Sequence, residues 1–324
     1  MVIAVVSLGL LIFVHELGHY AAARSVGVSP SEFSVGFGPL VASRTIAGTE
    51  FSLRMIPLGG YVNIGRQIDM VPPLPKIIIS AAGPVSNLFV AYLIFVSAAY
   101  VGVRRHSTVI ARVLDDSPAS VAGLQARDRI VAVNDRPVRA MEEIVSVDRR
   151  GDLRLNVERG GGQLSVVVPA SVADHKSQMG IVPDGTIMQR YGSKSFYQAQ
   201  VMMRKAVGGA VKSLRKMMKN RGGGSQIGGP VLVARAGAEL LGAGKGAMLH
   251  LVGIMSVNLC IINLLPLPFL DGSTIVVSLW ELFAGERIPQ FVQNIITGTG
   301  FILFTLVMVY VITRDLRGLK NPEA

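Results

Sequence analysis

Two histidines and a glutamate stand together near the start of the chain, within a segment that is otherwise apolar. They belong to the run His15-Glu16-Leu17-Gly18-His19. Residues four positions apart share one face of a helix, so both imidazoles can reach a single ion. Zinc favours such ligands, completed by one more protein ligand and a water, and a glutamate beside it can accept a proton from that water. The run therefore predicts a hydrolytic Zn²⁺ site with His15 and His19 as metal ligands and Glu16 as general base.

The apolar surroundings strengthen this prediction. An ionisable residue at the centre of a membrane span costs roughly 2.5–3.5 kcal/mol on insertion scales, so packing does not explain three of them within five positions. The alternative is a helix that ends before His15, with the motif at a solvated helix end, because residues 2–14 are too few for a full span. Residues 20–23 continue a helix easily as far as Arg24, which favours a motif inside the helix.

The third ligand is expected to be a carboxylate from a distant segment. Asp271 is the only Asp or Glu of the third apolar block, and it closes a run that begins at Asn263. Pro266 and Pro268 break the helix there and free backbone groups. Irregular backbone at membrane depth is tolerated where it lines a cavity or packs in protein. The run is therefore either part of a site or a surface loop in which Asp271 caps a helix, and spacing alone leaves both interpretations open.

The composition is that of an integral membrane protein. Of the 324 residues, 50% are hydrophobic and 16% are charged, and the mean hydropathy is +0.47, which excludes an ordinary soluble protein and a disordered one. The single cysteine, Cys260, excludes an intramolecular disulfide framework and a cysteine-rich metal site. Four apolar segments have about the length that a bilayer requires, near residues 2–23, 77–103, 247–270 and 295–312.

The polar segment between the second and third spans carries the charge of the chain. Residues 104–246 hold 23 Lys and Arg against 12 Asp and Glu, a net charge of +11. Residues 201–221 mix basic and apolar positions, which predicts an amphipathic helix, either on a membrane surface or packed on its own domain. Tethering beside a bilayer and a low aromatic content predict no nucleic-acid partner. Arg24 after the first span favours an extracytoplasmic insert, although the basic residues after 312 favour the reverse.

Two runs between the first and second spans alternate in the manner of β-strands. They cover residues 32–37 and 51–56, and a Pro- and Gly-containing run follows at 57–62. This punctuation predicts tight hairpins. Such strands either dip into the membrane interface and cover a cavity or form a small cytoplasmic sheet.

These motifs together resemble the site-2 protease family of intramembrane zinc metalloproteases, and more narrowly its bacterial regulator-of-sigma-E type with one PDZ domain. The resemblance rests on His15-Glu-Leu-Gly-His19 in the first span and on Asn263-x-x-Pro-x-Pro-x-Leu-Asp-Gly272 in the third. It covers nearly the whole chain in order, with residues 171–225 the least similar. Shorter matching runs lie at residues 36–39, 57–62, 83–87 and 229–230.

The resemblance assigns a role to each candidate residue. It implies that His15, His19 and Asp271 bind Zn²⁺, that Glu16 is the catalytic base, and that residues 83–87 pack at the core of the second span. It implies a membrane-reentrant hairpin that presents a strand edge to an extended substrate. The substrate-binding residues it implies are Phe51, Leu53, Gly59, Gly60, Tyr61, Asn263 and Pro266.

Residues 107–170 resemble one PDZ domain, through the run from Ser117 to Leu124 and the run from Asp128 to Asn134. Such a domain binds an extended peptide or a C-terminus, or acts only as a size filter. The chain departs from the family pattern in several places. It has one PDZ domain where relatives often have two, a short proline-rich linker at 65–76, and three unusual residues, namely Arg127 for Gly, Ser273 for Gly and Thr274 for His.

The expected fold is a polytopic α-helical membrane protein with about four transmembrane helices, a membrane-associated β-hairpin region and an inserted α/β PDZ domain. The expected parts are a first helix at 1–24, the hairpin region at 25–76, a second helix at 77–103, the PDZ domain at 104–170, a linker with the basic helix at 171–246, a third segment at 247–272, and the fourth helix with its tail at 273–324.

The expected function is cleavage of single-span membrane proteins, such as a pre-trimmed anti-sigma factor, in the bacterial inner membrane, with the lipid bilayer as surroundings and the PDZ domain outside the cytoplasm. One alternative is a non-catalytic PDZ scaffold with a structural zinc, for which Glu16 would be dispensable. A zinc transporter ranks last, because His250 is the only further ionisable residue inside the third span.

Overall fold

The computed structural model describes residues 2–65, 71–145, 152–168, 179–219, 244–268 and 270–289, together with scattered positions between 291 and 313. Most of the expected fourth span, the Gly229-Pro230 run and residues 66–70 of the proline-rich linker lie outside the described residues. The chain divides into two compact units, Met1–Val101 with Tyr191–Ala324, and Gly102–Arg190.

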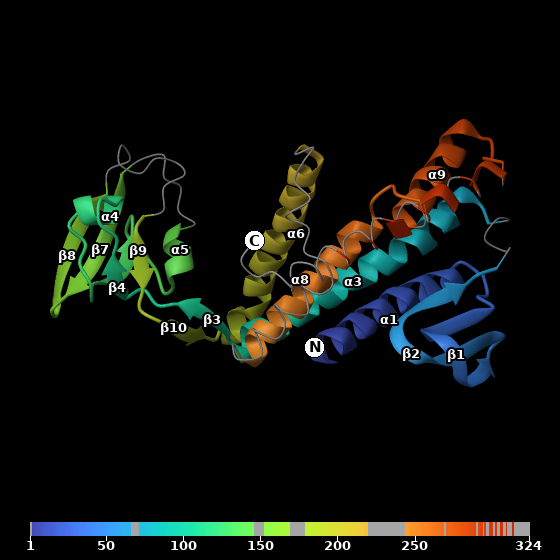
Figure 1. Ribbon diagram of the computed structural model, residues 1–324, viewed down its shortest axis with the longest axis horizontal. Coiled ribbons are helices and arrows are strands. Elements are labelled where there is room, and N and C mark those ends of the chain that lie inside the picture. Colours follow the sequence, from blue (N-terminus) through green and yellow to red (C-terminus); the bar gives the residue numbers. More distant parts are fainter. Residues whose placement is uncertain are drawn as a thin grey trace. The chain divides into compact units, whose positions relative to one another are not determined.

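Three helices of the first unit are long and apolar enough to cross a membrane, among the residues described. They are α1 (Val2–Ser25), α3 (Pro73–Val101) and α8 (Lys245–Asn263), and they lie side by side (Figure 1). The first three spans expected from the sequence are thus helices. Because α1 continues without a break to Ser25, the His15 motif lies inside a helix, and the alternative of a helix that ends before His15 is wrong.

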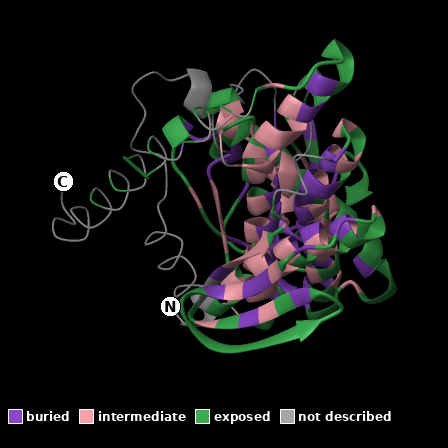
Figure 2. Ribbon diagram, turned by 90° about the vertical axis from the view of Figure 1, so that its right-hand side faces the viewer, coloured by how far each residue is buried: buried purple, intermediate pink, exposed green. Residues whose placement is uncertain are grey.

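Helix α3 is the central element of this unit, in contact with α1, α8, α6 (Ser195–Lys219) and α9 (Asp271–Ala284). Small residues allow the close approach of these helices. A Cβ on Gly18 of α1 would lie 2.5 Å from the Ala82 carbonyl oxygen of α3, and one on Gly253 of α8 would lie 2.5 Å from the Phe95 ring. Buried positions accordingly run along the packed helices (Figure 2).

Two long strands follow α1, β1 (Glu32–Ile46) and β2 (Thr49–Asn63), and they extend the strands expected from the alternation. Ala47 and Gly48 both have positive φ, of 48° and 81°, as a two-residue type I′ hairpin requires. The register is irregular, because residues 32–35 have Cα partners both at 50–53 and at 60–63. Residues 60–63 therefore form an edge that no other described strand covers.

An aromatic cluster attaches this sheet to α1. The buried ring of Phe33 lies 5.7 Å from Phe13, 5.7 Å from Tyr20 and 5.6 Å from Phe51, measured between ring centroids. The contacts of Phe33 with Phe13 and Tyr20 are edge-to-face, and such pairs stabilise the packing beyond the burial of apolar area. The part of the sheet that contains Phe33 and Phe51 is thereby held beside the helix that carries the histidines.

The unit Gly102–Arg190 has mixed α/β structure. Its described elements are β3 (Val103–His106), β4 (Ile110–Val113), α4 (Pro118–Val121), β5 (Arg129–Val133), β6 (Arg136–Pro137), α5 (Met141–Val145), β7 (Leu153–Arg159), β8 (Gly162–Val168), β9 (Ile181–Pro183) and β10 (Thr186–Gln189). The largest described sheet has the order β6-β5-β7-β8, and β4 pairs with β9 and β3 with β10. Ile110, Ile130, Ile144 and Leu155 form the centre of its core.

Asp128 anchors a loop of this unit. Its carboxylate is fully buried and accepts hydrogen bonds of 2.7 Å from Nε and from Nη2 of Arg159 and of 2.8 Å from the backbone N–H of Gln125. Burial raises the pKa of the Asp128 carboxyl, but these hydrogen bonds outweigh burial and hold the pKa below its usual value. The neighbouring Arg127 has a φ of 71°, so the left-handed conformation is kept although the residue is not glycine.

Candidate metal centre

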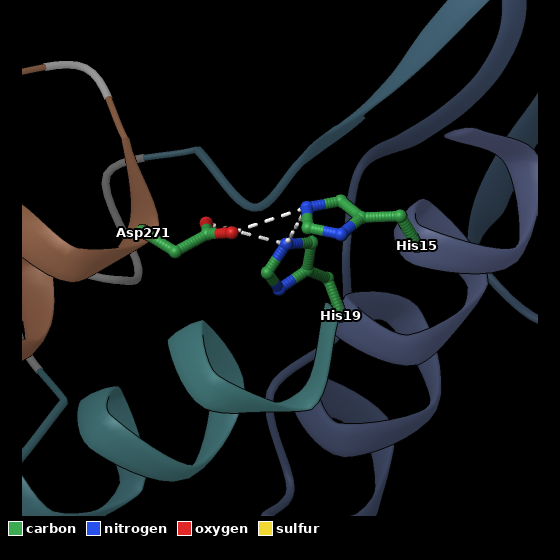
Figure 3. Close-up of side chains that lie close together, drawn as sticks. All are labelled: His15, His19 and Asp271. Carbon is green, nitrogen blue, oxygen red and sulfur yellow. Dashed lines mark hydrogen bonds and ion pairs between the residues drawn. The ribbon is translucent and has the colours of Figure 1, made fainter. Parts of the chain in front are cut away.

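The three predicted ligands meet at one point of the first unit (Figure 3). The Nε2 atom of His15 lies 3.1 Å from Asp271 Oδ2 and 3.1 Å from His19 Nε2, and the Nε2 atom of His19 lies 3.3 Å from Asp271 Oδ1. The ligand atoms all lie within 4.8 Å of one another, and both histidines are buried. The geometry therefore meets the expectation that a carboxylate from a distant segment converges with the two histidines.

Asp271 reaches the histidines because the chain breaks between two helices. Helix α8 ends at Asn263, residues 264–268 and 270 are not helical, and Asp271 begins α9. A Cβ on Gly272 would overlap the carbonyl oxygens of Leu264 and Leu265, so glycine permits the close return of the chain. Leu270 is the N-cap of α9, and the alternative of Asp271 as a helix cap in a surface loop is wrong.

The surroundings of the two rings fit a zinc ion. His19 Nδ1 lies 2.8 Å from the Ile79 carbonyl oxygen, which only accepts, so Nδ1 carries the proton and the Nε2 lone pair is free for a metal. Gly83 of α3 leaves the space that both rings fill, since a Cβ there would lie 2.6 Å from His19 Cε1 and 2.8 Å from His15 Cε1. Two imidazoles and a carboxylate are a ligand set of catalytic zinc.

A cavity of about 460 Å³ opens beside the three ligands. Glu16 lines it one residue after His15, together with Tyr61, Val62 and Asn263. Asn263 comes within 3.2 Å of His15 Nε2 through its side-chain nitrogen. The cavity thus brings together a carboxylate, an amide and the ligand cluster, with room for a peptide segment.

The candidate substrate-binding residues are divided between two places. Tyr61 and Asn263 line the cavity beside the ligands, and a Cβ on Gly60 would lie 3.7 Å from Glu16 Cγ. Gly59 immediately precedes the strand edge at residues 60–63 and has a φ of 95°. Phe51 and Leu53 instead line a separate apolar cavity of about 360 Å³, against Phe13 and Leu17 of α1. The exposed Pro266 does not line the ligand cavity.

Arg54 holds the edge strand of the sheet in place. Its Nη2 donates to Tyr61 Oη at 3.0 Å and to Glu32 Oε1 at 2.9 Å, and its Nε donates to Ser34 Oγ at 3.0 Å. One guanidinium therefore links the first residues of β1 to Tyr61, one of the residues of β2 that line the ligand cavity. Planar, forked donors suit this multiple contact.

The structure also reveals residues whose part in the site the sequence did not predict. Gly83 and Asn87 belong to a run that the resemblance placed only at the core of the second span, yet both contact the histidines. A fully buried asparagine within an apolar span is the signal that points to Asn87. Nearer the start of the same helix, Lys76 forms a buried ion pair of 3.2 Å with Glu281 of α9, and the second carboxylate oxygen of Glu281 has no hydrogen-bond partner.

The sequence has relatives along its whole length. Three curated proteins that carry the name "Putative zinc metalloprotease" are 29% identical in Campylobacter jejuni (96% of this chain, 92% of the relative), 30% in Nostoc (96% and 94%) and 32% in Helicobacter pylori (95% and 97%). The model of peptidase family M50 matches residues 3–307. With this match over nearly all of its length, the chain belongs to peptidase family M50.

Proposed function

We propose that this protein is an intramembrane zinc endopeptidase that cleaves single-span membrane proteins. Membership of the peptidase family and the relatives named as zinc metalloproteases make it a zinc-dependent metalloprotease. One observation carries the step to an intramembrane site: His15, His19 and Asp271 converge among apolar helices, beside the Glu16 carboxylate. Ionisable groups within spans mark functional sites.

The proposed chemistry divides among the residues of the cavity. His15, His19 and Asp271 would hold Zn²⁺, which when bound lowers the pKa of a water and polarises the scissile carbonyl. Glu16 takes the proton of the attacking water on its carboxylate and later gives it to the leaving amine nitrogen. The side-chain amide of Asn263 donates a hydrogen bond to the carbonyl oxygen or to the backbone of the substrate. Apolar helices around the site restrict the entry of other water.

The substrate would bind as an extended strand. A helical peptide bond is enclosed by its own hydrogen bonds, so a transmembrane helix must unwind before water attacks it. The uncovered edge at residues 60–63 lies beside the ligand cavity, and an added strand would satisfy its backbone groups. Tyr61 is fixed there by Arg54.

The further parts of the proposal concern the cell. By its resemblance, the protein lies in the bacterial inner membrane and acts on a protein already trimmed outside, such as an anti-sigma factor. The Gly102–Arg190 unit would be the PDZ domain, extracytoplasmic, and would bind a peptide end or exclude untrimmed proteins by size. Its mixed α/β structure and buried core support an independent domain of this kind.

Cleavage of a model single-span protein by the full-length enzyme in detergent tests this proposal. Glu16→Gln keeps the size of the side chain and removes its basicity, so cleavage should fall by about 10²–10⁴-fold with an unchanged zinc content. Glu50→Gln, on an exposed residue of β2, is the matched control and should cleave as the wild type does. Wild-type cleavage by Glu16→Gln would instead support the non-catalytic scaffold.

A further inference from the structure

We propose that Asn87 is a positioning residue for the metal centre, whose side-chain oxygen accepts a hydrogen bond from His15 Nδ1–H. This contact keeps the proton on Nδ1 and directs the His15 Nε2 lone pair to the metal. The inference rests on the proposed function, because it concerns the same zinc site. Helix α3 would then orient a metal ligand in addition to packing against its neighbours.

The contact between Asn87 and His15 is the first observation behind this proposal. Asn87 is fully buried, and its side-chain nitrogen lies 3.1 Å from His15 Nδ1. When the Asn87 side-chain nitrogen donates to His15 Nδ1, the neutral His15 ring must carry its proton on Nε2. A proton on Nε2 blocks coordination of a metal by that atom. The two ends of an amide have nearly the same shape, so a turn of 180° puts the oxygen at the same place. The side-chain oxygen of Asn87 has no hydrogen-bond partner at its present place, so the turn breaks no bond of that atom.

His19 shows the arrangement that His15 would share. Its Nδ1 faces the Ile79 carbonyl oxygen at 2.8 Å, an acceptor that fixes the proton on Nδ1. Ile79 and Asn87 lie on the same helix, and His15 and His19 on another that runs alongside it. Helix α3 therefore provides the hydrogen-bond partner of Nδ1 in both rings. For His19 this partner is a backbone carbonyl, and for His15 it is the Asn87 side chain. Partners of this kind orient metal-binding histidines and set their tautomer.

The position of Asn87 is itself fixed by a third helix. The hydroxyl of Ser256, a fully buried residue of α8, donates a hydrogen bond of 2.7 Å to the backbone carbonyl oxygen of Asn87. On α3 itself, Ser86 donates to the Val14 carbonyl oxygen at 3.0 Å. These bonds hold the backbone at Asn87 against both α1 and α8. The acceptor for His15 thus stands on a rigid support, as a precise ligand geometry requires.

Zinc affinity of the full-length protein, measured by competition with a chelator in detergent, tests the inference. Asn87→Asp keeps the shape and offers only acceptors, so its zinc affinity should stay within a few-fold of the wild type. Asn87→Leu keeps the volume and offers no acceptor, so its affinity should fall by about 10–100-fold. Ser97→Ala, on the same helix and away from the rings, is the control and should not change the affinity.

The outcomes separate the inference from the proposed function. Wild-type affinity in Asn87→Leu, or an equal loss in Asn87→Asp and Asn87→Leu, would overturn the role of the oxygen as acceptor. Asn87→Ala replaces Asn87→Leu if the larger side chain prevents folding, with the same expectation. A wild type that binds zinc through His15 but cleaves no substrate would refute the protease and leave the role of Asn87 intact.

Discussion

Gly83 lies against His19 so closely that a Cβ on this residue would overlap the Nε2 atom of the ring. The same Cβ would lie 2.8 Å from Cε1 of His15. The wall of the metal site is therefore the bare backbone of α3, and the rings fill the space that a side chain would occupy. A single methyl group added at position 83 therefore tests whether the rings pack against α3.

Gly83→Ala should abolish zinc binding or reduce it by at least about 100-fold, because the rings must rotate away from Asp271 to make room. Chelator competition on the purified protein measures the effect. Gly208→Ala is the control, since that glycine of α6 has open space around it, and alanine there stabilises a helix by up to about 1 kcal/mol. Unchanged zinc binding in Gly83→Ala would contradict the close packing of rings on α3.

Asn263→Ala should lower kcat by about 10²–10³-fold while zinc stays bound, because the variant removes the amide donor that we propose for the reacting carbonyl. Steady-state cleavage of a model substrate and zinc analysis of the same samples measure the two quantities. Asn258→Ala alters an exposed amide on the same helix, outside the ligand cavity, and should leave both unchanged. Loss of zinc from Asn263→Ala would show that Asn263 supports the metal instead.

The buried pair of Lys76 and Glu281 joins α3 to the helix that Asp271 begins. Lys76→Met leaves a buried carboxylate unpaired and should lower the free energy of unfolding by about 3–5 kcal/mol. Glu281→Gln together with Lys76→Met removes both charges and should cost less than Lys76→Met alone. Denaturant titration of the three proteins in mixed micelles gives these values, and equal costs for the single and double variants would argue against a paired charge.

Acid should selectively destabilise the Gly102–Arg190 unit through Asp128. The folded-state pKa of this carboxyl lies below its usual value, so its stabilisation is present above the unfolded pKa of about 3.9 and is lost as the pH falls through the folded pKa. Asp128→Asn should therefore be less stable than the wild type at pH 7, and the difference should shrink below about pH 4.

Thermal unfolding of both proteins across this pH range checks the acid effect. Asp115→Asn changes an exposed acid of the same unit and should show no such convergence. A difference between Asp128→Asn and the wild type that stays constant down to pH 3 would be inconsistent with a charged, hydrogen-bonded Asp128.

Sequence alone predicted the parts of the site that have a strong chemical signature. Two histidines one helical turn apart and a lone aspartate after a proline-broken segment have few other uses within apolar spans. The strands at 32–37 and 51–56 followed from alternation. Their irregular register did not, because pairing between distant residues leaves no period in the sequence. The ring contacts of Phe51, which the resemblance assigns to the substrate edge, with Phe33 and Tyr20 were likewise not predicted.

The contribution of α3 to the site was also hidden from the sequence. Gly83 and Asn87 belong to the site because they contact the histidines of α1. The sequence of α3 does not show which helix packs against it. The PDZ identity of the Gly102–Arg190 unit and the roles of the substrate-binding residues remain predictions.

The zinc content of Asp271→Ala tests the central claim most directly, because Asp271 is the metal ligand that the far segment would contribute beside His15 and His19. Elemental analysis of the purified full-length protein should find one zinc per wild-type chain, and much less than one in Asp271→Ala and in His15→Ala, with cleavage of the model substrate lost in both. Retention of one zinc and of full cleavage by Asp271→Ala would contradict the metal centre described for this protein.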